Sequence, residues 1–437
     1  MKYKTILGWL VILFLSLIPV YLWFHFGPGA ADLVDYSSIT HSLGELFGLV
    51  GMTMFALTFI LSTRITWIED IFGGLDKVYI THGILGGTAL MLILFHPIFL
   101  VLKFVPSDMQ RAAIYLLPSS YWSVNLGIIA LLGMISLIFV TLFTKIKYNK
   151  WKFTHEFLGL MFIIAAFHIF MVRGVVSQDN IFDGYYIYAS IVTAIGLFGF
   201  AYSLFIKGRL MRNAVYTIIK INQKGDFFEI VMSAEHKPIS YKSGQFVYLR
   251  FYNKNLGREE HPFSIASRSN DLNLRVVIKK LGDFTEKLGN LQVGEKVSVE
   301  GPYGRFNYTY HGKREQVWIA GGIGITPFLG MVQDIEDDND IKNNIYLFYS
   351  VKDDSELIGY KVLNETSAKS KKFKFIPWNS RKKGYLTTEK IYDIAGRFRD
   401  KEFFLCGPSR LKEGIIKELM DQGVPDNHIH EEAFDFR

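Results

Sequence analysis

Six apolar stretches in the first half of the chain are each long enough to cross a bilayer as a helix. The first 206 residues contain 11 of the 48 Lys and Arg and 10 of the 41 Asp and Glu, so charge is concentrated in the rest of the chain. We therefore expect a six-helix membrane unit followed by a soluble unit. The predicted spans are Ile6–Phe24, Leu43–Leu61, Val78–Leu102, Val124–Phe143, Thr154–Val172 and Tyr185–Ile206.

Loop charges predict the orientation of these spans. Basic residues gather in the 145–152 loop and in the 207–212 segment after the sixth span, and such residues favour the cytoplasmic side of a membrane. We expect the N-terminus and the soluble unit in the cytoplasm of a multi-pass plasma-membrane protein. The third and fifth spans then run in the same direction. His25 and His41 are expected in the outer loop, where either could line a site for an electron acceptor.

Two pairs of histidines lie in matching spans. His82 and His96 are fourteen residues apart in the third span, and His155 and His168 are thirteen apart in the fifth. Fourteen helical residues cover about 21 Å, which places one histidine of each pair near each side of a hydrocarbon core about 30 Å thick. Two imidazoles can fill both axial positions of a haem iron. The sequence therefore predicts one haem between His82 and His155 and another between His96 and His168. Histidines that only bridge helices are the alternative.

Beyond residue 212 the pattern changes to short alternating strands, which predicts an antiparallel β-barrel. From Gln316 onward, strands alternate with helical segments, as in a parallel α/β domain. We expect domains at 1–212, 213–312 and 313–437. Barrel strands are predicted at Val215–Ile221, Phe227–Ser233, Gly244–Phe251, Asn273–Lys280 and Lys296–Glu300. The α/β strands are predicted at Gln316–Ala320, Asn344–Ser350, Phe373–Pro377 and Glu402–Leu405, with helices at 326–336, 353–368, 387–395 and 409–422.

A four-residue motif beside a barrel strand has the chemistry that a flavin needs. Phe263 offers an aromatic wall, and Ser264 offers a hydroxyl to the ring system or the ribityl chain. His261 and Pro262 precede them. An ordinary β-bulge with a proline is the alternative interpretation.

Two further segments of the barrel are candidates for holding phosphate. Lys279 and the run Gly282, Asp283, Phe284 and Thr285 follow a strand and open a predicted helix. Helix N-termini and backbone amides suit a pyrophosphate group. Gly301 begins a turn that follows at a plausible distance, although a turn can be only a turn.

A glycine-rich loop follows the first predicted strand of the α/β domain. Gly321, Gly322 and Gly324 let the backbone approach a nucleotide pyrophosphate. Thr326 and Pro327 open the next helix, whose N-terminus favours the phosphate charge. The loop lies at the carboxyl end of the strand, where doubly wound folds bind their ligands.

Cys406, Gly407 and Pro408 follow the last predicted strand. A small polarizable thiol at this place can face a nicotinamide ring, and a buried structural cysteine is the alternative. Because Cys406 is the single cysteine, an internal disulfide and a cysteine-based metal cluster are excluded. The chain has no basic run with interleaved aromatic residues, so we do not expect nucleic-acid binding.

Together these motifs resemble the NADPH oxidase and ferric reductase superfamily, and most of all its compact bacterial NADPH oxidase homologues. The likeness covers nearly the whole chain. It implies a six-helix transmembrane haem domain followed by a ferredoxin-reductase-like module, with a β-barrel FAD domain and an α/β NADPH domain. The implied cofactors are FAD, NADPH and two b-type haems, the haems held by the four paired histidines.

The resemblance also implies roles for single residues near the flavin. Family members place a C-terminal aromatic residue over the flavin ring. Phe434 is the first candidate for this role and Phe436 the second. Ser264, Cys406 and Phe434 are then the expected catalytic positions.

The resemblance further implies that basic residues bind the 2′-phosphate of NADPH. Lys352 follows the second strand of the α/β domain, and Arg381 lies near the third. Both are candidates, although Asp353 and Asp354 stand beside Lys352 and oppose the assignment.

The implied activity is electron transfer from cytoplasmic NADPH, through FAD and the two haems, to oxygen on the far side of the membrane, with superoxide as the product. A ferric or other metal-chelate reductase with the same electron path is the alternative. Its chelate site could draw on Asp32, Asp35, His25 and His41. A membrane electron carrier that serves a partner protein is a third hypothesis. The short outer loops imply that no activating subunit is needed.

Overall fold

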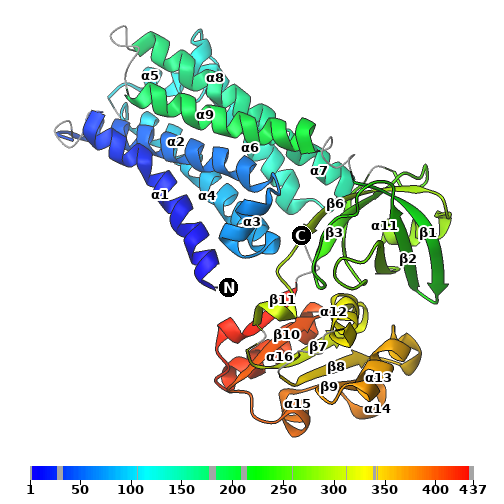
Figure 1. The fold of residues 1–437 in the computed structure, drawn as a ribbon. Helices are drawn as coiled ribbons and strands as arrows, with labels where there is room; N and C mark the ends of the chain where they lie inside the picture. Colours follow the sequence, from blue (N-terminus) through cyan, green and yellow to red (C-terminus); the bar gives the residue numbers. More distant parts are fainter. Residues whose placement is uncertain are drawn as a thin grey trace. The chain divides into compact units, whose positions relative to one another are not determined.

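The computed structural model of the chain forms two compact units, Lys2–Gly208 and Arg209–Arg437. The first unit consists of helices, and the second contains two β-sheets with their own helices (Figure 1). The structure describes residues 2–26, 33–105, 107–176, 184–207, 214–257, 259–311, 313–337, 341 and 343–432.

The described part of the first unit contains six apolar helical spans of bilayer-crossing length, which confirms the predicted six-helix unit. The fifth span consists of two helices that meet at Phe157, and the sixth continues into a π-helical turn, Tyr202–Ile206. The helices are α1 Lys2–Phe26, α2 Tyr36–Leu61, α3 Thr66–Phe72, α4 Leu75–Leu102, α5 Met109–Ile114, α6 Trp122–Phe143, α7 Tyr148–Glu156, α8 Leu158–Val176 and α9 Gly184–Ala201.

The first two helices extend beyond their predicted bounds. Asp35 caps α2 by accepting a hydrogen bond from the backbone N–H of Ser38 at 2.7 Å. Such a cap satisfies an amide that has no partner within the helix. The expectation of an outer loop around His25 and His41 is therefore wrong. His25 lies in the last turn of α1, and His41 lies in the second turn of α2.

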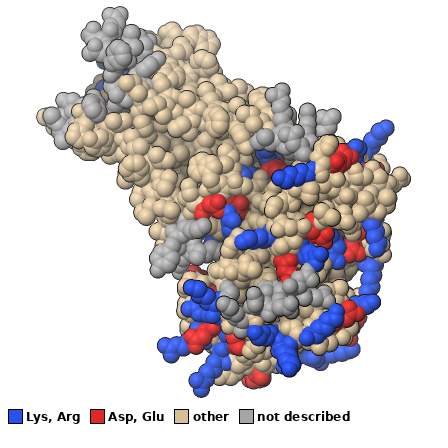
Figure 2. All heavy atoms as spheres, in the orientation of Figure 1, with Lys and Arg blue, Asp and Glu red and all other residues tan. Residues whose placement is uncertain are grey.

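The helices pack through small residues and present apolar side chains outward. α2 lies along α4 and α9, and α6 lies along α8. A Cβ built on Gly51 of α2 would lie 2.7 Å from Ile93 of α4, so glycine permits this approach. Phe14 and Phe143 are among many exposed apolar side chains. Figure 2 shows few charged side chains over this unit and many over the second. Such a surface requires lipid, so the chain is a multi-pass membrane protein.

The barrel is a six-stranded antiparallel sheet in the order β4-β3-β6-β1-β2-β5. A bridge between Ile265 and Val276 joins its two edges around a buried apolar core. The prediction missed β4, which is the flavin motif itself; Pro262 is tolerated there because β4 is an edge strand. The strands are β1 Val215–Lys224, β2 Phe227–Ala234, β3 Phe246–Phe251, β4 His261–Ser264, β5 Asn273–Lys279 and β6 Lys296–Tyr303, with the one-turn helix α11 at Asp283–Glu286.

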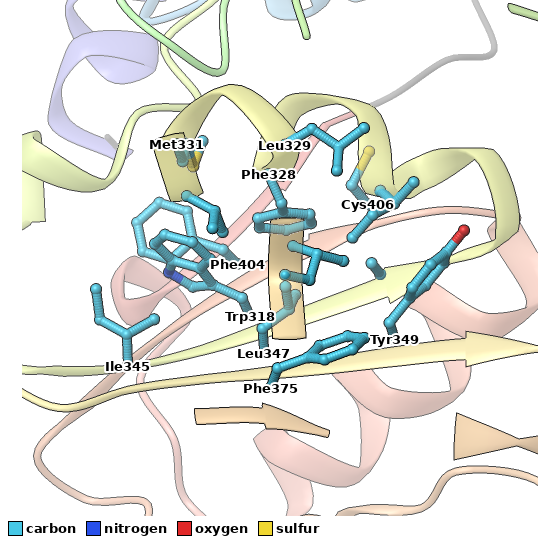
Figure 3. Close-up of a cluster of buried hydrophobic side chains, with 14 of the residues drawn as sticks. Trp318, Phe328, Leu329, Met331, Ile345, Leu347, Tyr349, Phe375, Phe404 and Cys406 are labelled. Carbon is cyan, nitrogen blue, oxygen red and sulfur yellow. The ribbon is translucent and has the colours of Figure 1, made fainter. Parts of the chain in front are cut away.

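The last domain has a five-stranded parallel sheet in the order β11-β10-β7-β8-β9. The order reverses beside β7, so the carboxyl ends of β7 and β10 flank the usual ligand crevice of such sheets. Helix α12 covers one face of the sheet, where its own Phe328 packs on Trp318, which also contacts Phe404 (Figure 3). The elements are β7 Glu315–Gly321, α12 Thr326–Asp337, β8 Ile345–Val351, α13 Tyr360–Lys369, β9 Phe373–Asn379, α14 Ser380–Lys383, α15 Thr388–Ala395, β10 Lys401–Cys406, α16 Ser409–Asp421 and β11 Ile429–Glu432.

The barrel and the α/β domain pack against each other through α12. The backbone N–H of Ser269 and its hydroxyl both bond to the carboxylate of Asp334, at 2.7 and 2.5 Å. A Cβ built on Gly330 would lie 2.5 Å from the carbonyl oxygen of Ser267. The segment that follows the flavin motif therefore lies on the helix that follows the glycine-rich loop. The predicted fold class, a helical membrane unit with a ferredoxin-reductase-like module, is confirmed.

Candidate electron-transfer site

The four paired histidines face each other within the membrane unit. His82 and His96 lie on α4, His155 lies in the last turn of α7, and His168 lies on α8. The ring centroids of His82 and His155 are 6.0 Å apart, and those of His96 and His168 are 6.3 Å apart. Two imidazoles bound to opposite sides of one metal ion have centroids about 6 Å apart, because each metal–nitrogen bond is about 2.0 Å long and each centroid lies roughly 1 Å behind its nitrogen. Both separations fit one iron between two rings.

Each of the four rings has a hydrogen-bond partner for its Nδ1 on a neighbouring helix or at its end. A carbonyl oxygen can only accept a hydrogen bond, so a ring facing one carries its proton on Nδ1 and leaves the Nε2 lone pair for a metal. The partners are the carbonyl of Thr58 for His82 at 3.0 Å, of Gly44 for His96 at 2.7 Å and of Ser123 for His168 at 2.6 Å, and the hydroxyl of Thr141 for His155 at 3.3 Å.

Glycines make room for two of these rings. A Cβ built on Gly48 would lie 2.7 Å from Nδ1 of His96. A Cβ built on Gly127 would lie 2.8 Å from Cε1 of His168. Both distances are below van der Waals contact, so any larger residue at either position must displace an imidazole.

The flavin motif contains an unsatisfied buried hydroxyl. Ser264 is 4% exposed, and its Oγ has no hydrogen-bond partner among the residues that the structure describes. A buried polar group without a partner is costly, so this hydroxyl fits a ligand that supplies one. His261 packs its ring on Phe284 at a centroid distance of 3.7 Å, and burial lowers the pKa of its imidazole. His261 therefore joins the motif to α11, while Pro262 and Phe263 are half-buried in β4.

The segment after β5 uses one of its backbone donors internally. α11 is a single turn, and the hydroxyl of Thr285 accepts the backbone N–H of Leu281 at 2.7 Å. The phosphate role of this segment stays a prediction. Lys279 ends β5, Gly282 precedes α11, Asp283 and Phe284 lie within it, and Gly301 lies in β6 with φ of +136°.

The glycine-rich loop and the Cys406 loop touch at the carboxyl ends of β7 and β10. A Cβ on Gly324 would lie 2.2 Å from the carbonyl oxygen of Cys406, and one on Gly407 would lie 2.9 Å from the backbone nitrogen of Gly321. Packing between the loops thus requires three of the glycines. Gly322 differs, because a Cβ there would meet no atom within 4 Å; its side of the loop is open to a ligand.

The residues flanking this contact stand at the starts of two helices, α12 and α16. Pro408 lies 2.9 Å from a Cβ built on Gly321. Thr326 is buried at the start of α12, and its hydroxyl donates to the carbonyl of Ile323 at 3.1 Å. Pro327 follows it in the first turn, where a missing amide proton costs nothing. The N-terminus of α12 is thereby fixed beside the open side of the loop.

Cys406 is fully buried at the end of β10 and has a carboxylate for a neighbour. Burial, reinforced by the charge of Glu432, raises the pKa of its thiol well above the ordinary value. Glu432 is 7% exposed at the end of β11, and the buried ammonium of Lys412 donates to its carbonyl at 2.9 Å. Neither residue was predicted from the sequence. The one available signal was that Glu432 stands just before the C-terminal aromatics.

We expect Cys406 to resist alkylation in the folded protein. The thiolate is the reactive form, and a buried thiol with a raised pKa supplies almost none of it at pH 8. Iodoacetamide followed by mass spectrometry should find no adduct in native protein and one adduct per chain in denaturant. Rapid labelling of the native protein at pH 8 would contradict the buried, neutral thiol.

The candidates for the 2′-phosphate are accompanied by carboxylates. Arg381 lies 3.5 Å from Asp353, and Asp354 accepts hydrogen bonds from Lys382 at 2.7 Å and Asn379 at 2.8 Å. The backbone N–H of Ser355 lowers the pKa of Asp353, and the Lys382 ammonium lowers that of Asp354, so both acids are charged at neutral pH.

Of the two residues predicted to bind the 2′-phosphate, Arg381 therefore lies beside a carboxylate, that of Asp353. Lys352 is exposed at the end of β8. The preference for NADPH over NADH stays a prediction. Phe434 and Phe436, predicted to cover the flavin, lie outside the described residues.

Comparisons with known families match the three parts of the chain in order. The model of the ferric reductase like transmembrane component matches residues 47–166, that of an FAD-binding domain matches 213–307, and that of the oxidoreductase NAD-binding domain matches 318–417. With the two observed units, these matches define a transmembrane flavin oxidoreductase that uses NAD(P)H and transfers electrons. Its architecture is that of the NADPH oxidase and ferric reductase superfamily, as the sequence predicted.

Individual relatives match this chain at low sequence identity. The reductase component of phenol 2-monooxygenase from a Pseudomonas species is 27% identical over 45% of this chain, and the anthranilate 1,2-dioxygenase electron transfer component of Acinetobacter baylyi is 29% identical over 45%. The chain spans 59% of the length of each. The Amycolatopsis cytochrome P450 reductase GcoB aligns with 51% of this chain and 69% of its own, at 19% identity and a TM-score of 0.44.

Proposed function

We propose that this protein is a transmembrane NADPH oxidase. Electrons from cytoplasmic NADPH cross the plasma membrane by way of FAD and two b-type haems, and oxygen on the far side is reduced to superoxide. The main support is the histidine geometry: two ring pairs 6.0 and 6.3 Å apart, with three of the four protons fixed on Nδ1 by backbone carbonyls.

The four histidines hold the haems, His82 with His155 and His96 with His168. Bound haem supplies a carrier of single electrons whose potential the surrounding protein sets. Because two imidazoles would ligate each haem iron, the iron would have no coordination site left for oxygen. A haem held in this way would supply single electrons to oxygen, and the one-electron reduction of oxygen gives superoxide.

The residues of the soluble unit hold the flavin and the nucleotide. Ser264 donates its hydroxyl to the flavin ring, and the loop from Gly321 to Pro327 holds the nucleotide pyrophosphate with backbone amides. Bound FAD supplies the conversion of a hydride into single electrons. Cys406 packs as a neutral thiol beside the nicotinamide, Phe434 covers the flavin with Phe436 as the second candidate, and Lys352 and Arg381 bind the 2′-phosphate.

A ferric reductase with the same electron path is the second candidate. One observation favours it besides the name of the matching family: His41 and Glu45, one turn apart on α2, bring an imidazole nitrogen and a carboxylate oxygen within 3.4 Å. These are ligand types that hold transition metals. They lie on the same helix as Gly44, whose carbonyl holds His96.

The deciding experiment measures NADPH oxidation by the purified protein with added FAD in air, using a superoxide-reactive dye with and without superoxide dismutase. Loss of the dye signal with dismutase supports the oxidase. NADPH consumption that requires an added ferric chelate contradicts it and favours the metal reductase. Consumption only in the presence of a co-purifying protein would instead indicate an electron carrier.

Replacing Gly127 with Val should release the haem held by His168. The added side chain occupies the position of the imidazole, which a Cβ alone would already approach to 2.8 Å. We expect the haem-to-protein ratio to fall from about two to about one. Ile129→Val, at an exposed position of the same helix, is the control and should keep both haems. Full haem content in Gly127→Val would contradict the assignment of His168.

A further inference from the structure

His155 is held differently from the other three paired histidines. Its Nδ1 faces a side-chain hydroxyl, that of Thr141, at 3.3 Å. The Thr141 hydroxyl donates its own proton to the carbonyl of Leu137 at 2.8 Å, so its oxygen accepts the Nδ1–H of His155. A backbone carbonyl is present whatever residue carries it. Among the four paired histidines, only the partner of His155 therefore depends on which side chain stands at its position.

Trp151 holds the same ring from its face. Its indole lies nearly parallel to the imidazole of His155, with a centroid distance of 5.3 Å and an interplanar angle of 16°. Its Nε1–H donates to the carbonyl of Thr141 at 3.3 Å. This carbonyl is among the last four of α6, which have no partner within the helix. Tyr148 in turn stacks on the indole, with a centroid distance of 5.7 Å.

Thr141 therefore accepts two hydrogen bonds. Its hydroxyl accepts one from the imidazole of His155, and its backbone carbonyl accepts one from the indole of Trp151, which covers that imidazole. We propose that Thr141 and Trp151 are positioning residues that fix the plane of His155 and set the reduction potential of the haem it holds. The proposal rests on haem ligation by His155, as argued under the proposed function. It goes beyond that function because it assigns the tuning of one haem to two residues that do not touch the iron.

The direction of the effect follows from the hydrogen bond. A bond accepted from Nδ1–H makes the imidazole a stronger donor through Nε2. A stronger donor stabilises ferric over ferrous iron and lowers the potential. Thr141→Val removes the acceptor and should raise the midpoint potential of one haem while leaving the other unchanged. Thr141→Ser keeps a hydroxyl and should leave both midpoints at their wild-type values.

The test is an anaerobic potentiometric titration of the full-length, haem-loaded protein in detergent. Ser136→Ala is the matched control, because this hydroxyl on α6 donates to the carbonyl of Leu132 in its own helix. Unchanged midpoints in Thr141→Val with both haems retained would overturn the inference alone. Wild-type protein that binds no haem would overturn the proposed function first, so the two failures are distinguishable.

Electron paramagnetic resonance gives a second readout, because the largest g value of a ferric low-spin haem depends on the orientation of its axial rings. The ring planes of His82 and His155 are inclined to each other by 56°. Trp151→Leu frees the imidazole plane and should shift or broaden one of the two low-spin signals, whereas Trp151→Phe retains a stacking ring and should largely preserve it. Phe153→Leu, an exposed aromatic on the same helix, should change neither signal. An unchanged spectrum in Trp151→Leu would overturn the role of the indole.

Discussion

His96→Leu is expected to bind one haem instead of two and to lose superoxide production, while NADPH still reduces the flavin. Leucine cannot ligate iron, so His168, whose ring centroid lies 6.3 Å from that of His96, would lose its partner in holding a haem. The nucleotide and flavin sites are built from the separate Arg209–Arg437 unit, so their chemistry should survive. Haem content per chain, dye reduction in air and anaerobic bleaching of bound flavin by NADPH measure the three parts separately.

Variants of both histidines of a pair test the assigned haem ligands more strictly than His96→Leu alone. His168→Leu should lose the same haem as His96→Leu, and the double variant should lose no more than either. His82→Leu should instead remove the other haem. His25→Leu, at the end of α1 and outside the two histidine pairs, is the control and should keep both haems. Loss of both haems in the His96→Leu and His168→Leu double variant would contradict the assigned pairs.

The spacing of the paired histidines could be predicted from sequence because helical rise and membrane thickness are fixed quantities. Both pairs then fall at matching depths when the helices run in the same direction. The partners of Nδ1 could not be predicted in the same way. Thr58 and Gly44 act through backbone carbonyls, and no feature of the sequence marks which carbonyl of a neighbouring helix meets a ring.

The soluble unit shows the same division. Alternating strands gave the order of elements, whereas β4 and β11 were missed because each has only four residues, and one contains a proline. The glycines were predicted from their phosphate chemistry. Two of them, Gly321 and Gly324, are required instead by contact between two loops that are more than eighty residues apart in the chain. Glu432 could be recognised as a neighbour of Cys406 only from the structure, because the parallel register of β10 and β11 pairs the two residues.

Gly324→Ala should cost the soluble unit both stability and nucleotide binding. The new methyl group would lie 2.2 Å from the carbonyl oxygen of Cys406 and 2.6 Å from the backbone nitrogen of Gly407. Neither atom can rotate away, so the loop must separate from the end of β10. Overpacking of this kind typically costs about 1–3 kcal/mol of unfolding free energy.

The displaced loop must carry the open side of Gly322 with it. The KM for NADPH should therefore rise in Gly324→Ala. The haem content should stay at its wild-type value. Gly414→Ala is the matched control, because its new methyl group meets no atom within 4 Å and its place inside α16 favours alanine by about 1 kcal/mol. Thermal release of FAD and the steady-state KM measure the two effects. If Gly324→Ala behaved like Gly414→Ala in both measurements, the loop contact would not be what positions the nucleotide. A raised KM without a lower release temperature would show that the contact orients the loop but contributes little to the stability of the fold.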